Sequence, residues 1–223
     1  MHTIKTLFLF LMILIFPAVA LAEGPEPNPP HWSVEVKGGL FYPDIDNWST
    51  YYGTNHMWHV AGSVGYKLLR QVELGVEAGM MRDHGQASAP INGIMTGNVE
   101  YSLWPLNVYA TYRAVFSERQ WLVPYVGGGW TRIYYREKVE AQQTIRGNAD
   151  GYHGRAGIQL LLDDLDTSAS NNLYLDFGIN HTYLVFEVQY SRVMVDTVSA
   201  TNNPSSSVNI GGTSYLGGFL FEF

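Results

Sequence analysis

Long stretches of two-residue alternation constrain this chain more than any other feature of its sequence. From Trp32 to Tyr42 the even positions are apolar or glycine, while the odd positions are mostly polar, charged or small. The same period recurs from Met57 to Leu68 and, after a short connection at 69–71, from Val72 to Met80. Successive side chains of a β-strand point to opposite faces. Each segment therefore predicts a strand with one apolar and one polar face.

Five further segments extend the pattern. They span residues 98–113, 121–138, 151–162, 182–196 and 208–223. In the first of them the apolar face changes phase between Leu103 and Leu106, so an extra residue in the ladder is expected, and Pro105 predicts a β-bulge at that place. Together the segments predict an all-β fold, an up-and-down antiparallel barrel of about eight strands.

The connections alternate in length, as they do in transmembrane barrels. The short ones lie at 69–71 and 117–120. The long ones, rich in Gly, Asn, Ser and Thr, lie at 43–56, 82–97, 140–150 and 197–207. We expect the long loops to face outward from the cell.

One segment departs from this scheme. Apolar residues recur every fourth position at Leu165, Ala169, Leu173 and Phe177. Asp166 is a suitable N-cap and Gly178 a suitable stop, which favours a short helix near 166–177. Alternation from Leu173 onward leaves a strand open as an alternative, and with it a barrel of ten strands.

Strands of this kind suit either a soluble barrel or a transmembrane one, and three details favour the membrane. The segments reach ten or more residues, which suits a tilted bilayer crossing. Aromatic residues stand near both ends of one apolar face, as with Trp32 and Tyr42 or Trp58 and Tyr66. The polar face mixes small residues with both signs of charge, which suits a narrow, filled interior.

Composition excludes several other classes. The chain of 223 residues is 46% hydrophobic and 15% charged, too apolar for a disordered protein. Its 13 basic residues against 20 acidic ones give no basic stripe for nucleic acid. With no cysteine, disulfide scaffolds and Cys-based metal sites are excluded. We expect no cofactor and no metal.

The first residues are typical of an export signal. Lys5 precedes an apolar run from Leu7 to Phe16, and Ala20-Leu21-Ala22 provides small residues before a cleavage point. We therefore expect a signal peptide at 1–22, a Pro-rich lead-in at 23–30 and the barrel at 31–223.

The polar faces of the predicted strands place a set of charged side chains in the barrel interior. The set comprises Glu35, Lys37, His59, Lys67, Glu73, Glu77, Arg132, Arg155, Glu187 and Glu222. An interior enclosed by about eight strands has room for little more than side chains. Because unpaired buried charge is costly, we expect these groups to form a network of ion pairs that plugs the barrel.

A catalytic interpretation of the polar residues is weaker. His153 or His181 as base, Ser191 or Ser214 as nucleophile, and Glu187 or Asp176 as orienting group are the candidates for a hydrolase. Their spacing matches no known triad, so we expect no enzymatic activity.

The last segment carries aromatic residues at alternate positions, Tyr215, Phe219, Phe221 and Phe223. Together with Pro124-Tyr125-Val126-Gly127-Gly128-Gly129, this resembles the small OmpA/OmpX/OmpW-like outer-membrane β-barrel superfamily, and most closely its deltaproteobacterial-type members. In such proteins the terminal aromatic strand is an assembly signal.

The resemblance implies a bacterial outer-membrane protein that contacts lipid and lipopolysaccharide. During biogenesis it would meet periplasmic chaperones and the barrel-assembly machinery. We expect a monomer with a structural or surface-interaction role. The alternatives are a small channel or carrier for hydrophobic or small solutes, as in OmpW-like relatives, and a barrel lipid hydrolase that modifies lipid A.

Overall fold

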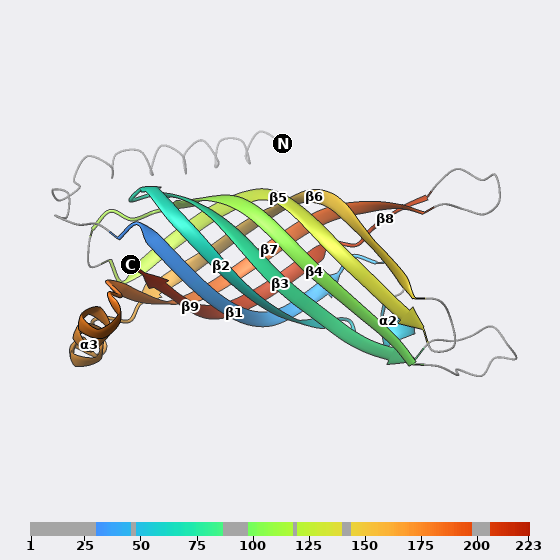
Figure 1. Ribbon diagram of the computed structural model, residues 1–223, viewed down its shortest axis with the longest axis horizontal. Helices are drawn as coiled ribbons and strands as arrows, with labels where there is room; N and C mark the ends of the chain where they lie inside the picture. The colour runs from blue at the N-terminus through green and yellow to red at the C-terminus, as the bar shows by residue number, and fades with distance from the viewer. Residues whose placement is uncertain (1–29, 46–47, 87–97, 118–119, 140–143, 198–205) are drawn as a thin grey trace, which may run out of the picture.

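The computed structural model is a closed antiparallel β-barrel (Figure 1). It describes residues 30–45, 48–86, 98–117, 120–139, 144–197 and 206–223. The eight wall strands are β1 (Trp32–Pro43), β2 (Met57–Leu69), β3 (Val72–Gln86), β4 (Asn98–Arg113), β5 (Leu122–Val139), β6 (Ile145–Leu161), β7 (His181–Thr197) and β9 (Gly212–Glu222). Each pairs with its neighbour in sequence, and β1 pairs with β9 to close the wall. The predicted up-and-down barrel of about eight strands is confirmed.

The two ends of the barrel differ, as Figure 1 shows. The short β2–β3 and β4–β5 connections, the helix α3 (Thr167–Phe177) and the C-terminus lie at one end, here called the turn end. The short helix α2 (Trp48–Tyr52) and the additional strand β8 (Ser206–Asn209) lie at the other, the loop end. The signal peptide and most of the Pro-rich lead-in predicted for 1–30 lie outside the described residues.

Alternation in sequence corresponds to alternation across the barrel wall. In β2, Trp58 and Val60 are 71% and 59% exposed, whereas the alternating residues His59 and Ala61 are 1% and 2% exposed. The apolar face therefore points outward and the polar face inward, the reverse of a soluble barrel. This is the arrangement that a lipid environment favours.

The outward apolar face forms a band bounded by aromatic side chains. On β5 the outward residues run from Leu122 through Val126 to Trp130 before Arg132 follows, a span of nine residues that matches a tilted bilayer crossing. The loop-end border is formed by Tyr42, Trp58, Trp104, Trp130, Tyr152, Tyr190 and Tyr215, and the turn-end border by Trp32, Tyr66, Tyr112, Trp121 and Phe223. Such girdles mark the two membrane–water interfaces.

The predicted bulge at Pro105 is wrong. The register between β4 and β5 runs unbroken from Val99 to Arg113, and Leu103 and Leu106 keep their regular places, inward and outward. The apolar residues change phase because the interior itself becomes apolar toward the loop end. Pro105 does lack an N–H for the ladder, and the β3–β4 pairing keeps its register but omits Pro105 and the adjacent Trp104.

The predicted helix near 166–177 is confirmed, and the ten-strand alternative is wrong. Asp166 accepts hydrogen bonds from the backbone N–H groups of Ser168 and Ala169, and Gly178 ends the helix with φ of 72°. That left-handed conformation suits glycine because it has no Cβ.

The bounds of several other elements differ from those predicted. β3 and β6 extend into the segments expected to be loops, as far as Gln86 and back to Ile145. The single strand expected over 208–223 is interrupted at Ile210 and Gly211, which separates β8 from β9. The helix α2 lies within the expected loop 43–56 and had no sequence signal.

Candidate functional site: the charged interior of the barrel

A cluster of buried charges around Lys37 occupies the interior. Its Nζ lies 2.7 Å from Glu187 Oε1, 2.8 Å from Glu77 Oε2 and 3.4 Å from Glu35 Oε1. Arg155 reaches the same carboxylates from β6, with Nη2 2.7 Å from Glu77 and Nε 3.7 Å from Glu187. Two cations thus face three carboxylates, and all five residues are buried. We call these five residues the central cluster.

Neutral polar side chains complete the central cluster. The Tyr125 hydroxyl donates to Glu187 at 2.8 Å, and the Asn107 amide donates to Glu77 at 2.8 Å. The Arg155 guanidinium lies 4.1 Å from the centre of the Tyr109 ring, a cation–π geometry. Most of the carboxylate oxygens are therefore satisfied, as buried charge requires. Oε1 of Glu35 has no hydrogen-bond partner.

A second group of charges lies nearer the turn end. Glu222 accepts from Lys67 and Arg113, each with a nitrogen 2.6 Å from Oε1. The Arg113 Nε donates to Gln159 at 2.9 Å, and its guanidinium lies 5.5 Å from the Tyr183 ring centre. This group joins strands that are far apart around the barrel, because its members come from β2, β4, β6 and β9.

Polar pairs continue the filling toward the loop end. His59 Nδ1 lies 3.0 Å from Ser214 Oγ, and His153 Nδ1 lies 2.7 Å from Thr131 Oγ1. A cavity of about 10 Å³ borders His59, Ser214 and Ser191. This volume is about that needed for one water molecule and is far too small for a substrate.

Two apolar clusters lie inside the barrel, one toward each end. At the loop end the buried members are Phe41, Trp48, Met57, Met81, Tyr101, Leu103, Ile133, Val193 and Ile210. At the turn end they are Val115, Val123, Tyr125, Leu161, Tyr183, Val185 and Leu220. Trp48 and Tyr52 of α2 pack on Tyr101 of β4, with ring centroids 5.3 and 6.0 Å apart, so the helix folds into the mouth of the barrel. Burial raises the pKa of the Tyr52 hydroxyl and of the Glu137 carboxyl at this mouth.

Of the ten side chains expected inside, the structure places all but Arg132 in the buried interior. Arg132 was misplaced because apolar residues occur at both odd and even positions of 121–138, so the sequence leaves the phase of this segment undefined. Its side chain points outward and pairs with Asp150 at 2.7 Å. Glu73 is buried near Lys67 without a direct ion pair, and one of its oxygens lacks a hydrogen bond. Arg113 was missed, although its inward position follows from counting two residues at a time from Tyr109.

The hydrolase candidates do not assemble into one triad. His181 and Ser191 are ten residues apart on β7, roughly 30 Å along an extended strand. Nδ1 of His181 contacts Asp163 at 2.7 Å, and Ser214 contacts His59 rather than either proposed base. His153 and Ser191 are cross-strand neighbours, but His153 Nδ1 contacts Thr131. Asp176 lies on the exposed helix α3.

The C-terminal aromatic residues lie on the outer surface of β9 and its end. Tyr215, Phe219 and Phe223 are exposed and Phe221 is half-buried. No described helix is long and apolar enough to cross a membrane. Within the described ranges no group of three His, Asp or Glu side chains is placed to hold a metal ion.

An inverted eight-strand barrel with aromatic girdles and a charged interior defines a transmembrane β-barrel. The sequence agrees, because the family model described as "Outer membrane protein beta-barrel domain" matches residues 8–212. The chain belongs to this family, and its place is the bacterial outer membrane. Comparison with curated proteins finds no match.

Solved structures show the same fold at low identity. The Pseudomonas aeruginosa outer membrane protein OprG is 12% identical over 88% of this chain and 97% of its own, with a TM-score of 0.56. Neisserial surface protein A is 13% identical over 86% and 97%, with a TM-score of 0.54. Ail, the Yersinia pestis attachment invasion locus protein solved with the heparin analogue sucrose octasulfate, is 9% identical over 88% and 100%, with a TM-score of 0.51.

Proposed function

We propose that this protein is an outer-membrane barrel with a plugged interior that serves a structural role and presents loops for surface interaction. The observation that carries the proposal is the central cluster. Lys37 on β1 and Arg155 on β6 bind carboxylates from two other strands, β3 and β7, so the charges cross-link the barrel instead of lining an open path. The apolar clusters toward both ends support the same conclusion.

The surface role draws on the arrangement of the two ends. Short connections lie at one end and the longer ones at the other, and in outer-membrane barrels the longer loops face outside. Two proteins of the same fold are named as a surface protein and an attachment invasion locus protein. We infer that the loop end is extracellular, that the protein is a monomer, and that the aromatic end of β9 serves as an assembly signal for the barrel-assembly machinery. The narrower deltaproteobacterial-type affinity stays a prediction.

Conductance in planar lipid bilayers tests the plug directly. We expect the purified native barrel to show no steady ion current, because water and ions would have to cross the central cluster and both apolar clusters. The variant Lys37→Met combined with Glu77→Gln and Glu187→Gln removes the charges that join β1, β3 and β7, and is the matched comparison. A steady current through the native protein would overturn the plug.

A small channel or carrier for hydrophobic solutes is the second candidate. The apolar cluster at the mouth favours it, because Tyr52 is partly exposed over the buried Trp48 and Tyr101 and provides an apolar contact for a solute. Uptake of a labelled alkane into barrel-containing vesicles, absent from empty vesicles, would favour this role over the first.

We propose that this protein has no enzymatic activity. Support comes from the separation of His181 from Ser191 and from the small cavity beside His59 and Ser214. Incubating the native barrel with lipid A tests this. Acyl-chain cleavage that is lost in His181→Ala would revive the hydrolase.

A further inference from the structure

The outward face of β5, β6 and β7 beyond the aromatic girdle carries an unusual concentration of positive charge. Its cations are Arg132, Arg136 and Lys138 on β5, Arg146 on β6 and Arg192 on β7. We call these five residues the outer basic patch. They are five of only 13 basic residues in a chain with a net charge of −7. Among the outward side chains that the structure describes on this part of the wall, Asp150 is the one carboxylate.

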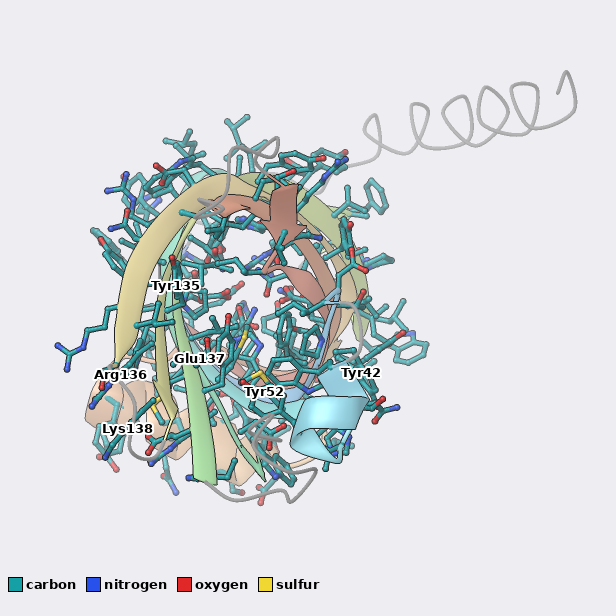
Figure 2. All side chains as sticks on the ribbon, turned by 90° about the vertical axis from the view of Figure 1, so that its right-hand side faces the viewer. Tyr42, Tyr52, Tyr135, Arg136, Glu137 and Lys138 are labelled. Atoms are coloured by element: carbon teal, nitrogen blue, oxygen red, sulfur yellow. The ribbon has the colours of Figure 1, made fainter. Side chains whose placement is uncertain are left out.

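The register places two of these cations directly opposite each other. Arg136 and Arg146 are cross-strand partners, and Arg136 has Ser102 on its other side. Like charges in this position destabilise a sheet. Figure 2 shows Tyr135 and Glu137 turned toward the interior while Arg136 and Lys138 lie on the outside of the wall. Glu137 therefore does not separate the two arginines.

No described carboxylate neutralises most of the outer basic patch. Arg132 pairs with Asp150, and on the neighbouring strands Arg82 pairs with Glu100. Among the described residues, Arg136, Lys138, Arg146 and Arg192 form no ion pair, and the Arg136 Nε is buried without a hydrogen-bond partner. Apart from Arg132, the described residues of this patch have no ion pair, although Glu100, which pairs with Arg82, is the cross-strand neighbour of Lys138.

Position determines which anion can reach the patch. Trp130 marks the girdle on β5, and the Arg132 guanidinium lies 5.3 Å from its ring centre. Tyr152 and Arg192 continue the same row across β6 and β7. The cations therefore begin where the apolar band ends, at the depth of the headgroups of the loop-end leaflet.

The dimensions of the patch indicate how large a headgroup it can bind. Neighbouring strands lie about 4.8 Å apart, so β5 and β7 are separated by about 10 Å, and Arg132 to Lys138 spans roughly 20 Å along the strand. A glycerophospholipid with one phosphate would engage a small part of it. A glycolipid with two or more phosphates on a sugar scaffold fits the whole, and arginine binds phosphate oxygens in a bidentate manner.

We propose that the outer basic patch is a binding site for the phosphorylated sugar headgroup of the glycolipid in the outer leaflet, lipid A of lipopolysaccharide. This inference rests on the outer-membrane location and the outward loop end. It does not depend on the plug, so a conducting barrel would leave it intact. The repulsion between Arg136 and Arg146 is relieved when phosphate lies between them.

Native mass spectrometry of the purified full barrel in detergent tests the site with defined probes. These are bis-phosphorylated lipid A, its dephosphorylated form, cardiolipin, inorganic phosphate and sucrose octasulfate. We expect lipid A to bind about tenfold more tightly than its dephosphorylated form, as loss of two charge-assisted contacts predicts. Cardiolipin should also bind less tightly, because its two phosphates are joined by a short glycerol and not held apart on a sugar scaffold. Inorganic phosphate is expected not to compete at equal concentration.

The variant Arg136→Gln with Arg146→Gln should lose about tenfold in lipid A affinity while it keeps the folded gel mobility. Arg70→Gln at the turn end is the matched control and should bind as the native protein does. If the double variant folds poorly, Arg146→Gln alone should still lose about threefold. Equal lipid A binding by the double variant would overturn the proposal. So would equally tight binding of cardiolipin, or of sucrose octasulfate, which would point to a sulfated sugar.

Discussion

The charged side chains in the interior of this barrel and those on its outer wall differ in how they are neutralised. Inside, Lys37 and Arg155 bind carboxylates from other strands, and most charged atoms have a partner, although one atom in each of Glu35, Glu73, Arg113 and Arg155 lacks a hydrogen bond. Outside, Arg136 faces Arg146 across the β5–β6 pair with no described carboxylate beside them. Interior charge is compensated by the chain itself because these side chains are buried. Exposed charge at the girdle can be compensated by a ligand, and the difference distinguishes a structural network from a binding surface.

The largest expected effect follows from removing the centre of the interior network. Lys37→Met leaves Glu35, Glu77 and Glu187 with Arg155 as their remaining cation. A buried pair broken in this way costs about 3–5 kcal/mol. We expect that loss in the free energy of unfolding, measured by urea titration in detergent. Arg192→Met on the outer wall is the control and should change it little. A loss below about 1 kcal/mol would mean that the central cluster contributes little to stability.

Glycines on the two faces of the wall provide a steric version of the comparison. A Cβ at Gly129, inside, would collide with the Val108 carbonyl oxygen, whereas at Gly154, outside, its nearest neighbour is 4.0 Å away. Gly129→Ala should therefore destabilise by about 1–3 kcal/mol, and Gly154→Ala should be neutral or slightly stabilising. Thermal loss of the folded gel band compares the two. Equal effects would argue against the assigned faces of β5 and β6.

Glu35 should matter least among the central carboxylates. Its contact with Lys37 is the longest, at 3.4 Å, and Oε1 has no hydrogen bond. Glu35→Gln leaves two cations with two carboxylates, so we expect a change within about 1 kcal/mol. Glu77→Gln, which removes contacts to both Lys37 and Arg155, is the paired variant and should cost more. If both variants unfold at the same urea concentration, charge balance does not govern this network.

On the outer wall the expected effect is smallest and has the opposite sign. Arg146→Glu replaces a repulsive cross-strand pair with an attractive one. The lipid-free barrel should gain about 0.2–1 kcal/mol in its free energy of unfolding. Arg146→Gln, which removes the repulsion without adding attraction, should fall between the variant and the native protein. A less stable Arg146→Glu barrel would show that Arg136 already has a partner.

Much of the wall could be predicted because two-residue periodicity is local. The phases of Trp32–Tyr42 and Met57–Leu68 define which side chains share a face, and residue types define which face meets lipid. Helix α3 was predictable for the same reason, since Asp166 and Gly178 act within one turn of its ends. Where apolar residues occupy both faces, the signal fails. This explains the false bulge at Pro105 and the misplaced Arg132.

Pairing between distant strands could not be predicted. Lys37 and Glu187 are 150 positions apart, and their contact depends on the closure of β1 on β9 and on the shear of the whole barrel. Nothing local predicts that α2 enters the mouth, because Trp48 and Tyr52 pack on Tyr101 of β4, which is distant in the sequence.

The sequence alone determined the class of this protein. Long alternating segments with aromatic ends expose their apolar face to lipid, and a closed sheet satisfies all their backbone hydrogen bonds there. It also indicated most of the charged residues inside, with Arg132 wrongly included and Arg113 missed. The tertiary structure decided how those charges pair, where the interior changes from polar to apolar, and that Arg136 meets Arg146 outside. These depend on register and closure, which are set by the sum of many weak cross-strand contacts and not by any one segment.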